Sequence, residues 1–216
     1  MPQMSAGLDA KYAALVPYTP YITAWSEELD EPVTIVERPT QRVGYLDETM
    51  YDRDRHGVLW LRSLVRQGVG EPQFARVHPL RQRRAMRLLL CNVCGRPADR
   101  SDEGVLWLLR DNRDDWPEWP ERMIVNEPPV CVPCARRASR MCPAMRLGPV
   151  AVRARRYPIV GVHGRLFRTT GTPWPEVVDF DNVLYSQPAS RWVQASKLVR
   201  NLVDCTLVPV ESLCPT

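Results

Sequence analysis

Long apolar runs are missing from this sequence, and their absence limits the kinds of protein it can encode. No uninterrupted apolar stretch approaches the ~20 residues that a membrane-spanning helix requires, so we expect no membrane partner. The N-terminus also lacks a basic region followed by an apolar core, which is the pattern of a secretion signal. We therefore expect a cytoplasmic location, where thiols stay reduced. The content of 44% hydrophobic and 25% charged residues is ordinary for a globular chain.

Lysine is nearly absent, whereas arginine is abundant. The 216 residues include 27 arginines and 2 lysines, a bias that a GC-rich genome produces without any function. The distribution of charge is more informative than its total. Residues 1–75 carry a net charge of −4, residues 76–168 carry +10, and residues 169–216 carry −2. A concentrated positive field of this kind attracts polyanions.

Cysteine, by contrast, is well represented, and four of the seven cysteines form two CxxC pairs. Two such pairs supply four thiolates, which is the ligand set of a closed tetrahedral zinc site. Because four protein ligands leave no open coordination position, we expect a structural zinc ion. Both pairs also lie in the two acid-free stretches of the chain. The pairs are Cys91 and Cys94 in CNVCG, and Cys131 and Cys134 in CVPCA.

The residues around each pair suit a zinc-binding turn. Gly95 can adopt the positive φ that a tight turn after the first pair often needs. Pro133 lies inside the second pair and a helix is predicted at residues 135–141, so the helix dipole stabilises the thiolates at its N-terminus. A pair on a turn, a hairpin and a pair at a helix start resemble the treble-clef or zinc-ribbon arrangement, here over residues 88–142.

The spacing between the pairs is longer than usual. The 36 residues between Cys94 and Cys131 exceed the about 15–20 of the commonest pattern. The segment WPEWPER accounts for the excess as an insertion at the hairpin tip.

The segments HPLRQRRAM, LLCNVCGRPADR, GVLWLL and PPVCVPCA resemble a group of uncharacterised proteins from actinobacteria and their phages, over residues 45–170. The resemblance implies the same four cysteines as ligands and supplies no activity.

Other interpretations of the cysteines are weaker. A CxxC dithiol is the redox centre of thioredoxin-like proteins, but the first pair lacks the strand–CxxC–helix context of that fold. Cys142 follows Cys134 by eight residues and is expected to be a buried neighbour rather than a ligand. Cys205 and Cys214 are expected to be spare thiols.

Histidine is scarce, and this argues against a nuclease. Treble-clef nucleases of the His-Asn-His type need a histidine between the ligand pairs to activate water, and His56, His78 and His163 all lie outside residues 95–130. A zinc deaminase requires proline before its CxxC motif, but Val130 occupies that position.

The segment DRDRHG offers a second candidate metal site. Asp52, Asp54 and His56 alternate and would meet one ion if they shared a strand face, although a solvated turn before a buried strand is the preferred interpretation. His163, between glycines, is interpreted as a turn residue rather than a catalytic base. The sequence contains no phosphate-binding glycine loop and no serine nucleophile elbow. We therefore expect no enzyme, with a treble-clef nuclease as a minor alternative.

Arginines precede and follow the zinc ligands on two predicted helices, residues 79–89 and 135–141. If the metal brings these helices together, their arginines line one surface, and the guanidinium forks match phosphate oxygens. DNA or RNA is therefore the preferred partner. The candidate contact residues are Arg81, Arg83, Arg84, Arg87, Arg136, Arg137 and Arg140.

A protein partner is the alternative. The tripeptide WPE occurs three times, twice in the segment that contains Trp116 and Trp119. Exposed tryptophans on a loop can anchor a protein interface, which would make this segment the core of a regulatory or interaction module. Packing of these tryptophans within the loop is the competing interpretation.

The fold class is predicted as α+β, with short antiparallel strands and a few helices around the cysteines. Pro79 suits the first turn of a helix because its missing N–H needs no partner there. Strands are predicted at 33–37, 41–46, 103–110 and 176–186, a hairpin from 150–156 and 159–168, and an amphipathic helix at 190–203.

Three segments are expected along the chain. They are a strand-rich segment at 1–75, a zinc-binding core with basic helices at 76–148, and a C-terminal hairpin and helix at 149–216 that forms one unit with the core. An internal echo, DRDRHGVLWL from Asp52 and DRSDEGVLWL from Asp99, suggests two equivalent and paired strands, although coincidence explains it equally well.

Overall fold

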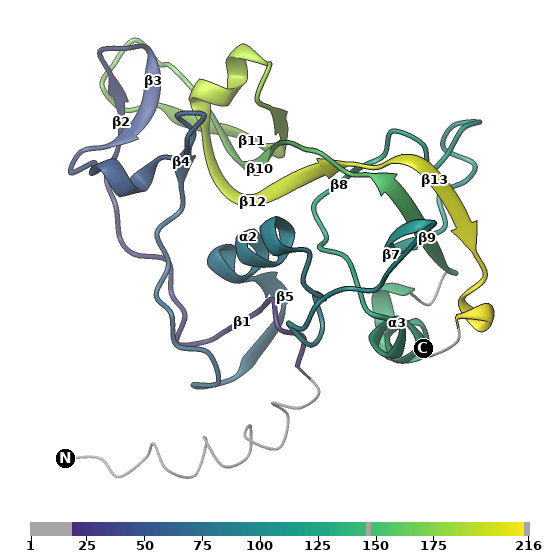
Figure 1. The fold of residues 1–216 in the computed structure, drawn as a ribbon. Helices are drawn as coiled ribbons and strands as arrows, with labels where there is room; N and C mark the ends of the chain where they lie inside the picture. The colour runs from purple at the N-terminus through teal and green to yellow at the C-terminus, as the bar shows by residue number, and fades with distance from the viewer. Residues whose placement is uncertain (1–18, 146–147, 214–216) are drawn as a thin grey trace, which may run out of the picture. The chain divides into compact units, whose positions relative to one another are not determined.

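The computed structural model describes residues 19–145 and 148–213 and has the α+β architecture expected from the sequence (Figure 1). The two α-helices of the described part are α2, Pro79–Leu88, and α3, Val132–Met141. None of the helices described has the length and apolar character needed to cross a membrane. The expectations for residues 1–18 and for Cys214 lie outside the described residues.

By its internal contacts the chain divides into two compact units. Among the described residues, unit 1 contains residue 19 and residues 23–80 and 160–198, and unit 2 contains residues 20–22, 81–159 and 199–213. The chain therefore passes from one unit to the other several times along its length. The three consecutive segments expected from the sequence are not the units in which the contacts cluster.

Unit 1 is built from short strands in three sheets. The largest has the strand order β11–β10–β12–β4, and β12 pairs with β4 in parallel. Two antiparallel two-stranded sheets, β1–β5 and β2–β3, complete the unit. The bounds are β1 Thr23–Trp25, β2 Ile35–Arg38, β3 Arg42–Tyr45, β4 Leu59–Trp60, β5 Pro72–Val77, β10 Ile159–Arg168, β11 Glu176–Leu184 and β12 Val193–Asn201, of which Ile159 and residues 199–201 belong to unit 2.

The amphipathic helix predicted at 190–203 is wrong. A 3-10 turn at Pro188–Trp192 leads into strand β12, which is followed by strand β13, Val203–Val208. Strand β12 lies between two other strands, and Val193, Gln194 and Ala195 in succession are all buried. A strand buried on both faces loses the period-2 alternation that distinguishes strands from helices in a sequence.

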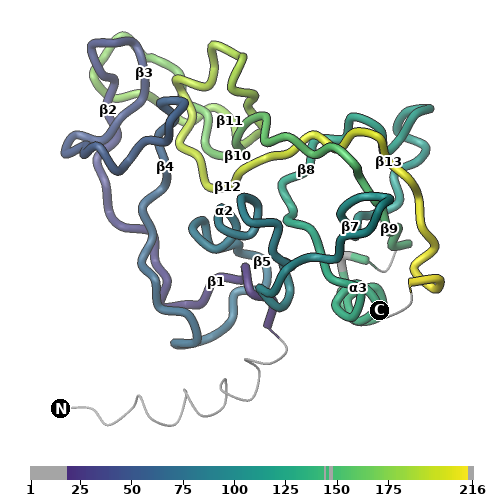
Figure 2. The backbone as a smooth tube through the Cα atoms, viewed as in Figure 1, coloured from purple at the N-terminus to yellow at the C-terminus, as the bar shows by residue number. Residues whose placement is uncertain are grey.

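Unit 2 is organised around one antiparallel sheet with the order β13–β9–β7–β6. Strand β7 is buried on both faces: Leu106 and Leu108 pack with the cysteines, whereas Trp107 and Leu109 pack in a second apolar cluster. Figure 2 shows the yellow β13 beside the green β9. The bounds are β6 Arg100–Ser101, β7 Gly104–Arg110 and β9 Pro149–Arg156; β8, Ile124–Val125, pairs with residues 200 and 201 of β12.

The hairpin predicted from residues 150–156 and 159–168 is wrong, although both strands exist. Strand β9 pairs with β7 and β13, so neither of its edges is left for β10. The two strands are joined by Tyr157 and Pro158, and proline has no N–H to donate to a ladder. The Pro158 carbonyl instead accepts a hydrogen bond of 3.1 Å from the N–H of Asn201. The chain therefore leaves one sheet at Pro158 and enters another.

The two copies of the internal echo do not form a pair. The first copy contributes β4 to unit 1, where it pairs with β12. The second copy contributes β7 to unit 2, where it pairs with β6 and β9. The similarity reflects two buried strands of like composition.

A charged pair fixes the turn between β3 and β4 in unit 1. The guanidinium of Arg62 donates to both carboxylate oxygens of Asp52, each at 2.8 Å, and lies 4.6 Å from the ring centre of Tyr45. The Tyr45 hydroxyl donates to the Trp60 carbonyl at 2.9 Å and accepts from Gln194 at 2.8 Å. The hydrogen bonds from Arg62 lower the pKa of Asp52 from 3.8 to about 2.

This pair predicts an acid-sensitive stability of unit 1. Because the pKa of Asp52 is depressed in the folded state, its contribution of about 2 kcal/mol is present above pH ~4 and is lost as the pH falls toward ~2. The variant Asp52→Asn should therefore lower the free energy of unfolding by about 2 kcal/mol at pH 7 and by much less near pH 2. Urea unfolding at both pH values measures this.

The matched control is Asp47→Asn, because Asp47 contacts the same arginine but its side chain is 70% exposed. An exposed pair contributes about 1 kcal/mol at most. Equal losses in both variants, or a loss in Asp52→Asn that does not depend on pH, would contradict the assignment.

Candidate metal centre

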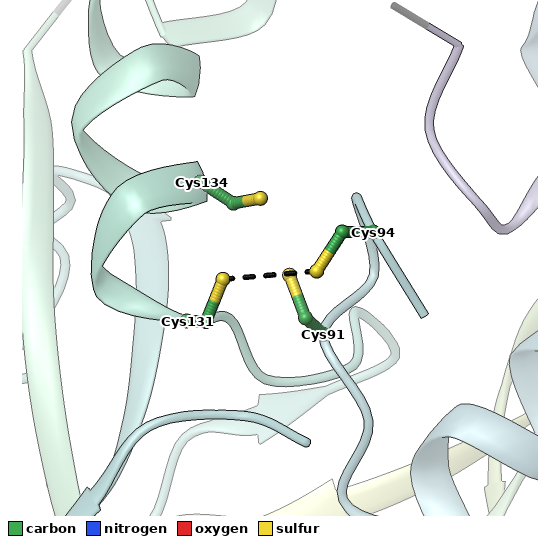
Figure 3. A group of neighbouring side chains, drawn as sticks. All are labelled: Cys91, Cys94, Cys131 and Cys134. Carbon is green, nitrogen blue, oxygen red and sulfur yellow. Dashed lines mark hydrogen bonds between the residues drawn. The ribbon is translucent and has the colours of Figure 1, made fainter. Parts of the chain in front are cut away.

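Four sulfur atoms meet in unit 2, as the sequence predicts. The Sγ atoms of Cys91, Cys94, Cys131 and Cys134 all lie within 4.8 Å of one another. They point toward a common centre in Figure 3, where Cys131 and Cys134 extend from the start of helix α3 and the other two from a loop. The Sγ atoms of Cys94 and Cys131 are 3.8 Å apart. Bonds of about 2.3 Å from one tetrahedral zinc ion would put the sulfurs about 3.8 Å apart.

The first pair lies on a tight turn that directly follows helix α2. The Cys91 N–H donates to the Arg96 carbonyl at 2.7 Å, and the Gly95 N–H donates to the Cys91 carbonyl at 2.9 Å. Gly95 has φ = +70°, the left-handed conformation expected at this position. A Cβ atom at Gly95 would lie 2.9 Å from the ring of Tyr21, whose own N–H donates to the Val93 carbonyl at 2.8 Å. The turn is thus held by its own main-chain hydrogen bonds and by contacts with Tyr21.

The second pair lies at the N-terminus of helix α3. Cys131 is the N-cap residue with an extended backbone, and its carbonyl accepts from the Ala135 N–H at 2.9 Å. The helix begins at Val132, three residues earlier than predicted, so Cys134 lies inside its first turn. The thiols of both residues therefore lie near the positive end of the helix dipole, which favours thiolate charge.

Main-chain hydrogen bonds join the two pairs. The Pro129 carbonyl accepts from the Asn92 N–H at 3.0 Å, and the Val130 carbonyl accepts from the Asp99 N–H at 3.1 Å. The Val130 N–H donates in turn to the Leu106 carbonyl on β7 at 2.9 Å. The approach to Cys131 is therefore held between the first turn and the central sheet of unit 2.

Burial shapes the acidity of the four thiols. Cys91 and Cys134 are fully buried with Leu106 and Leu108, and burial raises the pKa of Cys91 to about 11 and also raises the pKa of Cys134. Burial opposes the ionisation of Cys94 as well, but hydrogen bonds from the Arg96 backbone and side chain outweigh it and lower the pKa of Cys94 to about 7. A bound cation would compensate the cost of holding four thiolates in this apolar site.

The remaining described cysteines lie outside this cluster. Cys142 is the C-cap residue of α3, at the other end of the helix from Cys131. The Cys205 sulfur lies 3.8 Å from the Pro120 carbonyl, and burial raises its pKa to about 12. Neither joins the four-cysteine group, which is the one metal-binding group of this kind found among the described residues.

The structure separates the candidate arginines by exposure. Arg81 is only 6% exposed, although the adjacent Leu80 is 45% exposed, so burial of Arg81 gives no support to its prediction as a contact residue for nucleic acid. Arg83 and Arg136 are half-buried. The exposed candidates are Arg84, Arg87, Arg137 and Arg140.

Sequence reasoning missed Arg96, which is exposed and bonds to the sulfur of Cys94. Its signal was its place directly after CNVCG. The Nη1 atom of Arg84 lies 3.3 Å from the Tyr21 hydroxyl, and the ring of Tyr21 covers Gly95, so Arg84 and Arg96 lie beside the same turn.

The tryptophan loop is not the exposed anchor that the sequence suggested. Trp119 is only 6% exposed and packs in the apolar cluster that contains Trp107 and Leu202. Trp116 packs against the same cluster, and its Nε1–H donates to the Glu121 carbonyl at 3.3 Å. Trp116 and Trp119 therefore cover the face of the unit 2 sheet that carries Trp107.

The alternating residues of DRDRHG have structural partners instead of a shared ion. Asp52 binds Arg62, and Asp54 accepts from the Trp60 Nε1–H at 3.1 Å. His56 stacks on Tyr185 with 3.8 Å between ring centres. A turn before a buried strand is the better interpretation, and its exposed residues are Arg55 and His56, whereas Asp52 is buried. His163 belongs to strand β10 rather than to a turn, and its Nδ1 lies 3.1 Å from Asn182 Oδ1.

A scan against protein-family models, a search of curated proteins and a search of solved structures gave no match to this chain.

The first turn predicts a sharp difference between two glycine substitutions. In Gly95→Ala the new methyl group meets the ring of Tyr21, so both the melting temperature and the metal content should fall. In Gly57→Ala the residue has a similar φ of +76° but nothing lies within 4 Å of the methyl group, so only the backbone strain of about 1–2 kcal/mol is expected. Thermal melting with metal analysis compares the two, and equal effects would contradict the closed turn.

Proposed function

We propose that the four cysteines hold one structural zinc ion and that unit 2 is a zinc-stabilised, nucleic-acid-binding module of a cytoplasmic protein. The convergence of four sulfur atoms within 4.8 Å carries the proposal. Thiolates are soft ligands that favour zinc, and their spacing suits tetrahedral coordination. Zinc bound in this way would join the turn after α2 to the start of α3. A pair on a turn followed by a pair at a helix N-terminus supports a treble-clef type of site.

We propose that the site performs no catalysis. Four thiolates complete a tetrahedron and leave no position for water or substrate. The three histidines of the sequence, His56, His78 and His163, belong to unit 1, whereas the cysteines belong to unit 2, which gives no support to a treble-clef nuclease. Zinc would instead contribute free energy to folding, because the four cysteines belong to, or pack against, one apolar cluster of unit 2.

The exposed arginines of unit 2 support the nucleic-acid partner. Arg84 and Arg87 lie one turn apart on α2, and Arg96 lies on the adjoining turn. No acidic residue occurs from residue 72 to residue 98, and Asp99, three residues after Arg96, pairs with Arg153 instead. Exposed arginines of this kind contact phosphate oxygens in either DNA or RNA. Arg137 and Arg140 on α3 extend the set of candidate contacts.

The zinc proposal predicts a defined metal content. The purified protein should contain one zinc ion per chain by inductively coupled plasma mass spectrometry, and Cys94→Ser should lose that zinc together with a large part of its thermal stability. The matched control is Cys142→Ser, which removes a thiol outside the cluster and should keep both. An unchanged zinc content in Cys94→Ser would contradict the site.

The nucleic-acid proposal predicts a salt-dependent interaction. Fluorescence anisotropy with labelled duplex DNA, single-stranded DNA and RNA should show binding that weakens steeply with salt. The variant Arg84→Ala/Arg87→Ala should reduce the slope of log K against log salt by about 1.8, since each phosphate contact to a duplex contributes about 0.9.

The control Arg55→Ala/Arg191→Ala makes the same charge change at exposed positions of unit 1 and should leave the slope unchanged. Absence of binding at low salt, or equal losses in the two double variants, would contradict the proposal. Neither result would affect the zinc assignment, which the metal analysis tests separately.

A further inference from the structure

Strand β11 of unit 1 is an open sheet edge. Within the described residues it is the terminal strand of its sheet and pairs with β10 alone. Residues 176–181 are all exposed, so no other described segment covers them. Three of them are large and apolar: Val177 is 56%, Val178 is 44% and Phe180 is 53% exposed. An exposed edge with apolar side chains is a template for pairing with another strand.

The outward N–H groups of this edge are occupied by the strand's own polar side chains. In an antiparallel pair, alternate residues of an edge strand direct their N–H and C=O groups away from the partner. The N–H of Phe180 donates to Asp179 Oδ1 at 2.7 Å, and that of Asn182 donates to Asp181 Oδ1 at 2.6 Å. The N–H of Leu184 donates to Gln187 Oε1 at 2.8 Å. Two carboxylates therefore occupy main-chain positions that an added strand would use.

The two faces of the edge differ in chemistry. The register pairs Phe180 with Arg165 and Asn182 with His163, which places these four side chains on one face. The Phe180 ring meets the His163 ring edge-on with 4.5 Å between centres, so the exposed ring is held in place. Asp179 and Asp181 lie on the other face. Glu176 pairs with Arg168, but neither aspartate has a basic partner among the described side chains.

We propose that β11 binds an extended segment of another protein in which basic and apolar side chains alternate. The segment would add as a fifth strand to the β11–β10–β12–β4 path, a recognised mode of peptide binding. Its carbonyls would accept hydrogen bonds from the outward N–H groups of β11. Asp179 and Asp181 would then be released from these N–H groups. Basic side chains two residues apart would then pair with Asp179 and Asp181, while the intervening apolar side chain covers Phe180.

Charge selects this partner over a second copy of the chain. Two β11 strands paired with each other would bring their aspartates together, and like charges on neighbouring strands are destabilising. An added strand without basic residues would displace the carboxylates from their N–H donors and leave them without a partner. Because the whole chain carries a formal net charge of +4, general attraction does not explain the binding of a cationic peptide.

The experiment uses fluorescence anisotropy with the full chain and a labelled peptide of nine residues that alternates arginine and valine, with blocked termini; nine is the length of β11. A peptide of the same composition with its arginines and valines in separate blocks is the first control. The second control is a peptide with the alternating order in which every other residue is N-methylated, so that one edge of the peptide has no N–H groups to donate. We expect the alternating peptide to bind about tenfold or more tightly than either control, because pairing needs both the register and the main-chain N–H groups.

Two protein variants connect the binding to β11. Asp179→Asn/Asp181→Asn keeps oxygen acceptors for the outward N–H groups but removes both charges. It should lower the affinity for the alternating peptide by about tenfold or more. Asp102→Asn/Asp114→Asn makes the same charge change at exposed positions of unit 2 and should leave the affinity unchanged. Circular dichroism checks that both variants fold like the parent chain.

Equal binding of the alternating, block and N-methylated peptides would overturn the proposal, because the attraction would then be unspecific. An affinity that the Asp179→Asn/Asp181→Asn variant leaves unchanged would overturn it as well. A third contrary result is a dimer in analytical ultracentrifugation that becomes tighter in this variant and that the peptide does not dissociate. The edge would then pair with a second copy of the chain.

Discussion

Hydrogen bonds of the main chain bring the two cysteine pairs of unit 2 together, and the other features of this unit depend on that alignment. The short segment before Cys131 has two prolines, which offer acceptors but no donors. Its Pro129 carbonyl accepts from Asn92 in the first turn and its Val130 carbonyl accepts from Asp99, while its one N–H bonds to β7. The sulfur atoms therefore lie close together through the backbone that carries them, and a metal ion would complete a nearly assembled site.

The sheet of unit 2 packs against an apolar cluster on each of its two faces. Strand β7 alternates between Leu106 and Leu108, which pack with the cysteines, and Trp107 and Leu109, which pack in the second apolar cluster. On the second face the loop containing Trp119 closes the apolar cluster. The loop thus provides packing, whereas exposed arginines of the unit lie on both helices, at Arg96 and on several strands and loops.

Much of this arrangement follows from the sequence, and the failures have identifiable causes. Proline at residue 79 and the CxxC pairs predicted α2, α3 and the metal centre, because these signals are local. Strand β12 was mistaken for a helix because both of its faces are buried, which erases the alternation of a strand. The positions of Arg81 and Trp119 depend on packing against distant segments, which neither charge nor spacing encodes.

Extended X-ray absorption at the zinc edge of the purified chain tests the central claim most directly, because it reports the ligand atoms themselves. We expect a single shell of four sulfur atoms at about 2.3 Å with no nitrogen or oxygen ligand. A mixed shell that includes nitrogen or oxygen, or a protein that takes up no zinc under reducing conditions, would contradict the assignment of Cys91, Cys94, Cys131 and Cys134 as one closed structural site.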